Sequence, residues 1–312
     1  MGLSASAPWL RYYGNTPVSL DYPHKTMYQL VADAAKKYPK TPAYVFYGKE
    51  TSYASFMRRI DAAAKGLIHM GIRKGDKVTI CMANTPQALD CFYALNYLGA
   101  VPNMIHPLSA AQEIAFYLNF SKSKAILTLD QFYYKVSGIL PQLEHPTEIL
   151  IARVAEELPL PLSVLYPMTK GARAIKKLPK TGYTLWQAMV KAGKDVALEP
   201  EKGTCEDCGA ILYSGGTTGT TKGIMLSNLN FNALALQTIA ASGFTMEEIS
   251  DMKMLSVMPV FHGFGLGIGI HTALIGGACC ILVPKFNVNT YADLLIKKQP
   301  NIIPGVPTLF EA

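Results

Sequence analysis

Charged side chains are scarce in this sequence of 312 residues. They make up 16% of the chain, whereas an average soluble domain has about 25%. Half of the residues are apolar, which is enough to build a large core in two α/β lobes or in one large domain. So few charges indicate that part of the surface contacts a further protein segment or a membrane.

Acidic residues are absent from one stretch. Residues 158–194 hold seven Lys or Arg and neither Asp nor Glu, so the net charge of +7 arises in this segment. A basic segment this local indicates contact with an anionic membrane surface or a mobile solvated loop. No nucleic-acid partner is expected.

Helix-forming sequence is interrupted in the same segment. Four prolines lie within residues 157–182, so we expect a loop, or a short basic helix near residues 169–178, and no long helix. One interpretation is a peripheral membrane patch, and the other is a mobile insertion, which the prolines favour. The patch would combine the lysines with Leu160, Leu162, Leu165 and Tyr166.

Residues 255–284 contain no charged side chain at all. Their length would suit a membrane span, but Pro259 and six glycines between residues 263 and 277 interrupt the run. We therefore expect two buried strands, at 254–260 and 278–284, with a glycine-rich helix between them.

Cysteine is also sparse, at six residues. The pair in CEDC, at 205–208, has no second pair within zinc-site spacing, so no metal ligands are expected. Cys279 and Cys280 lie in an apolar run and are predicted to belong to the core. No segment resembling a secretory signal opens the sequence, and we expect a reducing cytoplasmic location, with peripheral membrane contact as a variant.

Strands and helices alternate in the first part of the chain. Residues 43–53 predict two short strands around a Gly-Lys turn, and strands are expected at 77–82, 100–105 and 124–129. Helices are expected at 54–71, 85–99 and 109–120, the second with Thr85 as N-cap and Pro86 at its first position. Alternation of this kind predicts βαβ units and a mostly parallel sheet.

A hydroxyl-rich loop follows an apolar strand in AILYSGGTTGTTKGIMLSN, residues 210–228. Glycines let backbone N–H groups converge on one point, and hydroxyls with one lysine suit a polyphosphate. The Walker pattern fails, because Thr221 precedes Lys222 and Gly223 follows it. The dinucleotide fingerprint fails too, and an ordinary surface loop is the alternative. A helix is expected to follow, capped by Ser227 or Asn228.

This stretch resembles the phosphate loop of the adenylate-forming, or AMP-binding, superfamily, which includes acyl-CoA synthetases, luciferases and peptide-synthetase adenylation domains. It departs from the usual pattern at Gly215, where Ser is common, at Thr221, where Pro is common, and at Asn228, where His is common. Other stretches resemble the family in the same order, at residues 48–56, 80–107, 124–129, 258–286 and 301–312. The resemblance is most like an acyl-CoA synthetase and covers nearly the whole chain outside the basic segment.

The resemblance implies an α/β fold of two flavodoxin-like, doubly wound lobes, with the second lobe truncated. Residues 74–225 would form one lobe, and residues 22–70 with 226–312 the other, with residues 158–194 as a basic insertion. Residues 1–312 would then be a partial N-terminal AMP-binding domain. Segments that the family places further along are absent, so we expect a fragment that is inactive without the C-terminal domain.

The resemblance also implies the chemistry. ATP would activate a carboxylic acid, fatty or aryl, to acyl-AMP, and coenzyme A would then take the acyl group as a thioester. Mg²⁺ would accompany ATP. His262, Lys222 and Thr218 would be catalytic, and the implied phosphate contacts are Ser214, Gly215, Gly216, Thr217, Thr218, Gly219 and Lys222.

A histidine stands where the resemblance expects a contact to the substrate carboxylate. In PVFHGFGL, His262 occupies a position where amino-acid-activating members tend to have Asp, which implies an acid without an α-amino group. A core histidine is the alternative for His262 and the preferred interpretation for His271, whereas His106 indicates only a turn. The implied substrate-binding residues are Phe261, His262, Gly263, Gly305 and Pro307.

Two other functions stay open at this point. A relative in the same superfamily could load acyl-AMP onto a carrier protein instead of coenzyme A. A different class of protein would be a non-catalytic, peripheral membrane-binding protein that uses the basic segment.

Overall fold

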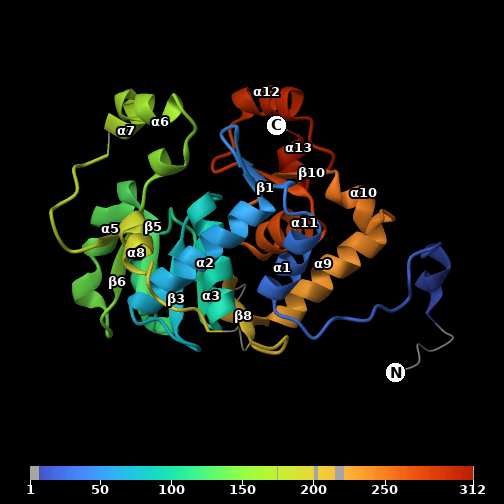
Figure 1. The fold of residues 1–312 in the computed structure, drawn as a ribbon, viewed down its shortest axis with the longest axis horizontal. Coiled ribbons are helices and arrows are strands. Elements are labelled where there is room, and N and C mark those ends of the chain that lie inside the picture. Colours follow the sequence, from blue (N-terminus) through green and yellow to red (C-terminus); the bar gives the residue numbers. More distant parts are fainter. Residues whose placement is uncertain (1–6, 174, 200–202, 215–220, 312) are drawn as a thin grey trace.

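The computed structural model describes residues 7–173, 175–199, 203–214 and 221–311. Within these residues the strands form two sheets (Figure 1). The first has the order β7 (Thr184–Leu185), β6 (Glu148–Ala152), β5 (Ala125–Leu129), β3 (Lys77–Cys81), β4 (Val101–Met104), β8 (Cys208–Ser214) and β9 (Lys222–Ser227). The second has the order β10 (Lys253–Ser256), β11 (Cys279–Leu282), β1 (Pro42–Phe46) and β2 (Lys49–Ser52).

Parallel pairing dominates both sheets, as expected for βαβ units. Only two of the described pairs, β8 with β9 and β1 with β2, are antiparallel. The predicted α/β class with parallel sheets is therefore confirmed. The division into two lobes stays a prediction, and β9 crosses the boundary proposed at residue 225 because it pairs with β8.

Helices cover and connect the sheets, with α2 and α3 between them (Figure 1). The longer helices are α1 (Met27–Lys37), α2 (Tyr53–His69), α3 (Pro86–Leu98), α4 (Ala111–Ser121), α9 (Asn228–Ser242) and α12 (Val288–Lys298). The shorter α-helices are α5 (Tyr133–Ser137), α6 (Leu162–Leu165), α7 (Lys170–Arg173), α8 (Trp186–Ala192), α10 (Met246–Ser250), α11 (Ala273–Ile275) and α13 (Pro307–Phe310). Single turns are η1 (Pro8–Tyr12), η2 (Asp130–Phe132), η3 (Leu140–Gln142), η4 (Val154–Glu157) and η5 (Tyr166–Met168), and η6 (Phe264–Thr272) is a π-helix.

Local signals placed most helix ends correctly. Thr85 is the N-cap of α3, with Pro86 at its first position. Ser227 caps α9 through a capping box with Asn230, so the prediction of a cap at Ser227 or Asn228 is confirmed. The first hairpin turns at Tyr47 and Gly48, both with positive φ, rather than at a Gly-Lys pair as predicted.

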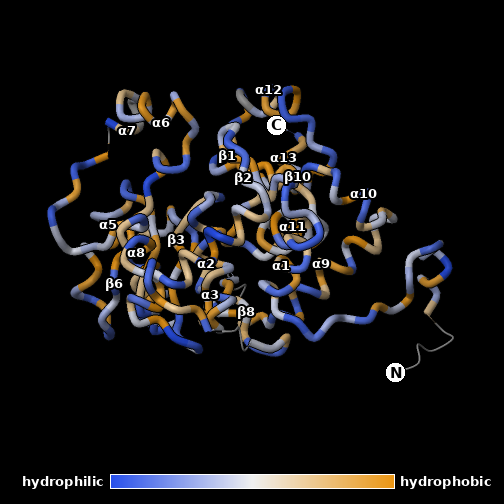
Figure 2. The backbone as a smooth tube through the Cα atoms, in the orientation of Figure 1, coloured by the Kyte–Doolittle hydropathy of each residue, from blue (hydrophilic) through white to orange (hydrophobic). Residues whose placement is uncertain are grey.

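One core joins the two sheets. Tyr53 begins α2 and donates hydrogen bonds from its hydroxyl to the carbonyl oxygens of Leu274, at 3.0 Å, and Ala278, at 2.8 Å. Phe56 of the same helix packs edge-to-face against Tyr93 of α3. Hydrophobic stretches gather in the strands and on the helix faces between them (Figure 2). This shared core holds the ends of the two sheets in a defined relative position.

The uncharged run at 255–284 folds as predicted into strand, helix and strand, although the helix is a π-helix. Cys279 and Cys280 are buried in β11, which confirms their assignment to the core. No helix in the described part of the chain is long and apolar enough to cross a membrane.

The described residues of the basic segment, 158–173 and 175–194, form only short helices, α6, η5, α7 and α8, as its prolines predicted. The segment also contains the strand β7, and β6 lies before it; we predicted none of β6, β7 and α8. The strand β6, EILIA, has the apolar, β-branched composition of its neighbours, so a local signal was available there. The strand β7 has only two residues and depends entirely on pairing with β6.

Candidate active site

The carboxyl ends of the parallel strands point to the site. In the first sheet, β3 is followed by Asn84 and β4 by His106, while β8 ends at Ser214. In the second sheet, β10 leads directly into residues 257–263. Ligands of open parallel α/β sheets bind outside the carboxyl ends of the strands, so the facing edges of these two sheets define the candidate site.

Asn84 joins these two edges and is not among the site residues that the sequence predicted. Its amide nitrogen donates to the carbonyl oxygens of Ser256, at 2.8 Å, and Met258, at 2.9 Å, while its oxygen accepts from the N–H of Val260 at 2.8 Å. The side chain is buried. It holds the segment before Phe261 and His262 in place. A polar residue directly after an apolar strand was the available signal.

An open groove of about 340 Å³ lies at the same junction. The rings of His106 and Phe261, both of which line the groove, pack with their centres 4.4 Å apart. The sequence had indicated only a turn at His106. Apart from His106, no ionisable side chain stands among the described lining residues. These are His106, Leu108, Val257, Met258, Pro259, Phe261, Val283, Pro284, Phe286, Val306, Thr308 and Leu309.

His106 is neutral at physiological pH in this setting. Partial burial, and secondly the charge of Lys135, lower the pKa of His106 below its ordinary value. Its Nδ1 accepts a hydrogen bond from the N–H of Leu108 at 2.8 Å, which fixes the ring orientation. The turn prediction is therefore correct but incomplete, because the same turn places an uncharged imidazole against Phe261.

The two arms of the phosphate-loop stretch, β8 and β9, pair antiparallel, so a strand and not a helix follows the loop. Ser214 at the end of β8 pairs with Lys222 at the start of β9. A Cβ at Gly223 would lie 2.8 Å from the ring of Phe120, so this close approach favours glycine after the lysine. Lys222 is exposed and Ser214 half-buried. Outside the described residues lie Gly215, Gly216, Thr217, Thr218 and Gly219.

His262 lies beside that hairpin. A Cβ at the next residue, Gly263, would lie 3.2 Å from Leu212 of β8, two residues before Ser214. The His262 side chain is exposed, and its Nδ1 accepts a hydrogen bond from the N–H of Phe264 at 3.2 Å. The core-histidine alternative for His262 is therefore wrong.

His271 is a core histidine, as predicted. Its ring is fully buried. Nδ1 lies 3.1 Å from the hydroxyl of Tyr93, and Nε2 lies 2.9 Å from Oδ1 of Asn232. Burial lowers the pKa of His271 to about 3, so the ring stays neutral and holds α3, α9 and η6 together.

The two predicted residues from the last segment shape the groove without lining it. Gly305 packs against Leu309 and Phe310, and Pro307 is the first residue of α13. Their neighbours Val306, Thr308 and Leu309 face the groove instead. A proline at the first position with the apolar residues after it was the signal for this arrangement.

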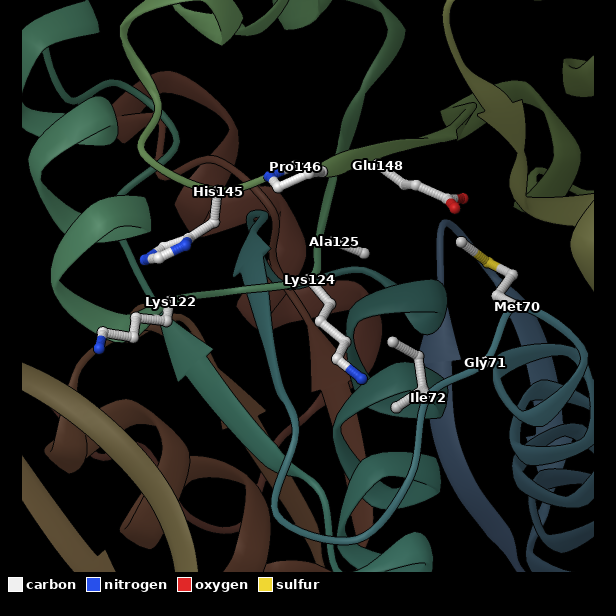
Figure 3. A pocket seen from close by; sticks show the side chains of 9 residues that line it. All are labelled: Met70, Gly71, Ile72, Lys122, Lys124, Ala125, His145, Pro146 and Glu148. Carbon is white, nitrogen blue, oxygen red and sulfur yellow. The ribbon is translucent and has the colours of Figure 1, made fainter.

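A second groove, of about 480 Å³, lies at the opposite, amino ends of β5 and β6 (Figure 3). It contains Lys122, Lys124, His145 and Glu148. The Lys124 ammonium is already paired with Asp76 at 2.8 Å. Because parallel sheets bind ligands at their carboxyl ends, we do not assign the active site to this groove.

The described residues contain no group of three or more His, Cys, Asp or Glu that could hold a metal ion. The steps proposed below therefore use only side chains of this chain.

Comparison with known proteins identifies the family of this chain. A family model described as AMP-binding enzyme matches residues 31–312, and the chain belongs to this family. It is 29% identical to a long-chain-fatty-acid–CoA ligase of Bacillus subtilis (strain 168) over 311 residues, which covers 99% of this chain and 55% of the relative. It is 25% identical to 4-coumarate–CoA ligase 4 of Arabidopsis thaliana over 260 residues, covering 83% of this chain and 42% of that protein.

Solved structures show the same fold. A long-chain-fatty-acid–CoA ligase from Archaeoglobus fulgidus matches with a TM-score of 0.73 and 22% identity, covering 91% of this chain and 52% of that one. The chain thus spans about half the length of the relatives it matches.

Proposed function

We propose that this chain takes part in the ATP-dependent activation of a carboxylic acid to acyl-AMP, followed by transfer of the acyl group to coenzyme A. The observation that carries the proposal is an apolar groove at the carboxyl ends of strands from both sheets, lined by His106 and Phe261, with the adjoining Gly263 packed against Leu212 of β8, the strand that leads into the hydroxyl-rich stretch. Membership of the AMP-binding family and the names of the relatives support it.

The chemistry explains why two such features are needed. A carboxylate is a poor acylating group because a thiol would have to expel oxide from it. In the proposed first step a carboxylate oxygen attacks the α-phosphorus of ATP, an O–P bond forms, and the bond to pyrophosphate breaks. In the second step a thiolate attacks the acyl carbon, and AMP leaves with the oxygen.

We expect residues of the hairpin to bind the phosphate groups of ATP. Two anions must approach in the first step, and a fixed cation with preorganised donors lowers the energy of that encounter. We assign Lys222, Ser214 and the loop between them, including Thr217 and Thr218, to the β- and γ-phosphates. The exposed Nζ of Lys222 lies on the hairpin arm next to that loop.

We expect residues that follow β10 of the second sheet to bind the carboxylic acid. We assign His262 to the carboxylate, because its side chain is exposed, the next residue, Gly263, approaches Leu212 of β8, and the preceding residue, Phe261, lines the groove. The rest of the acid would lie in the groove, whose lining carries no ionic side chain that could pair with an amino group. The proposed substrates are therefore fatty or aryl acids, and not α-amino acids.

Pyrophosphate exchange by the full-length protein tests the proposal. Hexanoate, palmitate, 4-coumarate and benzoate are compared with leucine as the amino-acid control. We expect exchange with at least one apolar acid, none with leucine, and thioester formation when coenzyme A is added. Folded protein that binds ATP but shows no exchange with any acid would refute acid activation. Exchange without transfer to coenzyme A would point to a carrier protein as acceptor.

A further inference from the structure

The part of the basic segment that contains α6 and η5 exposes an unusual concentration of large apolar side chains. Leu160 is 78% exposed, Val164 66% and Met168 64%, and Leu162 and Leu165 are each nearly half exposed. Single exposed apolar residues are common, but a contiguous group marks an interaction surface. Figure 1 shows α6 and α7 at one extremity of the molecule, and Figure 2 shows hydrophobic residues in α6.

Exposed cations continue directly from this apolar group. Arg173, Lys176, Lys177 and Lys180 are all exposed, and no acidic residue occurs between positions 158 and 194. We call residues 160–180 the docking segment. Its apolar part and its basic part follow each other in the chain without an acidic interruption.

The docking segment is anchored to the body at one point within its apolar part and at another within its basic part. Tyr166 packs against the main core, and Leu178 against the smaller core of the first sheet. The hydroxyl of Tyr134, in α5, donates to the carbonyl oxygen of Lys177 at 2.6 Å, and the ammonium of Lys176 lies 5.7 Å from the centre of the Tyr134 ring. These contacts hold the segment to the body of the molecule at Tyr166 and at residues 176–178, while the other described side chains stay exposed.

Two acidic side chains, Asp130 and Glu156, lie near the start of the docking segment, and the positive charge of Arg153 acts on both. Asp130 lies close enough to Tyr166 to affect its pKa, and Glu156 precedes the segment in η4. Burial raises the pKa of both carboxyl groups, and Arg153 opposes that increase in each case. These carboxylates are partly buried beside a cation and do not cancel the charge of the exposed lysines.

We propose that the docking segment binds the surface of an anionic lipid bilayer. Exposed Leu, Val and Met side chains gain free energy when they enter the boundary between headgroups and acyl chains. The following Lys and Arg residues then meet the lipid phosphates. An acidic protein would satisfy the cations but would leave the apolar group in water, so a lipid surface fits both parts. This proposal does not depend on the enzymatic activity.

Vesicle sedimentation with the whole chain tests the proposal. We expect the chain to sediment with vesicles of phosphatidylcholine containing 30% phosphatidylglycerol, and not with phosphatidylcholine alone. A lysine near an anionic surface contributes about fivefold in partitioning, so the triple variant Lys176→Gln, Lys177→Gln, Lys180→Gln should bind on the order of a hundredfold more weakly. The triple variant Leu160→Ser, Val164→Ser, Met168→Ser should bind at least about tenfold more weakly.

A matched control separates the segment from net charge. Lys40, Lys253 and Lys285 are exposed residues elsewhere, and changing all three to Gln alters the net charge equally. This control should bind anionic vesicles like the wild type, and all variants should have wild-type melting temperatures. An equal loss of binding in the control would overturn the proposal. The proposal would also be overturned if the wild-type chain did not sediment with anionic vesicles, whether or not it bound an acidic peptide such as polyglutamate.

Discussion

At the scale of single residues, three histidines of this chain differ in burial and in their contacts. His271 is buried between two hydrogen-bond partners, His106 stands against Phe261 in the groove, and His262 is exposed beside β8. Burial lowers the pKa of the first to about 3. The ring of His262 is exposed and is therefore accessible to a carboxylate from solution.

His262→Ala in the full-length protein should slow acyl-AMP formation far more than thioester formation from supplied acyl-AMP. Loss of one preorganised donor typically raises a barrier by about 2.7–4 kcal/mol, which is a loss of roughly 100- to 1,000-fold. Because the side chain is exposed, the free energy of unfolding should change by less than about 0.5 kcal/mol. Measuring the two half-reactions separately provides the check.

His271→Ala is the control for that experiment. It removes a buried ring with two polar partners, so it should lower the melting temperature and reduce both half-reactions in proportion to the folded fraction. Equal residual rates of the two half-reactions in His262→Ala, at wild-type stability, would remove His262 from the proposed site.

Lys222→Ala should weaken ATP binding without affecting the fold. A charge-assisted contact to phosphate is worth about 1.5–3 kcal/mol, so the dissociation constant for ATP should rise by roughly 10- to 150-fold. Titration with a fluorescent ATP analogue measures this directly, and Lys253→Ala is the control because Lys253 is an exposed lysine that also begins a strand. Unchanged affinity in Lys222→Ala would exclude it from the phosphate site.

The elements of the two sheets are joined by a few buried polar links. Asn84→Ala would leave the N–H of Val260 and the carbonyl oxygens of Ser256 and Met258 without their partner. A buried group left unsatisfied costs about 1–3 kcal/mol, so we expect the free energy of unfolding to fall by at least about 2 kcal/mol. Urea unfolding measures it. Asn15 is exposed, so Asn15→Ala is the control and should have the wild-type free energy of unfolding. A wild-type free energy of unfolding in Asn84→Ala as well would show that the Asn84 hydrogen bonds do not stabilise the fold.

A buried ionic cluster joins α2, α3 and η4. Arg59 bonds Asp90 at 2.6 Å and Glu157 at 2.6 Å, and both carboxylates are almost fully buried. Burial is the largest effect on Asp90 and raises its pKa from 3.8 to about 6, with Arg59 opposing and Glu157 adding to the shift. Two carboxylates on one guanidinium leave an excess of negative charge in the core.

This cluster predicts the pH dependence of stability. Because the folded pKa of Asp90 is raised, the folded state binds its proton more tightly than the unfolded chain. The resulting stabilisation is present below pH 3.8 and is lost as the pH rises towards 6. The unfolding free energy of the wild type, relative to Asp90→Asn, should therefore fall between pH 4 and pH 7 in urea titrations. A difference that rises with pH over this range would show that Arg59 outweighs burial.

The whole molecule should be cut by trypsin first in the docking segment. Exposed basic residues on short helices and loops are preferred cleavage sites, and Arg173, Lys176, Lys177 and Lys180 meet this description. We expect the earliest fragments, identified by mass spectrometry, to end within residues 170–180. Lys297 in α12 is also exposed and provides the comparison, because a first cut there instead would contradict the expectation.

Much of the fold could be predicted because its signals are local. Apolar runs, a capping serine and a proline at a first helical position identified most elements from residue 42 to residue 129 correctly. The strand β9 was missed, since Ile224 and Met225 of this edge strand are exposed and the preceding glycines indicated a loop. Its structure follows from pairing with β8, which no local pattern encodes.

The sequence by itself determined the α/β class and the family, because those depend on order and spacing along the chain. Only the tertiary structure decided what meets at the site. Asn84 bonds to residues more than 170 positions away, and His106 reaches Phe261 from the other sheet. The structure also decided that His262 is exposed while His271 is buried. Burial and long-range contact are properties of the packed chain, since they arise only when both sheets close on one core.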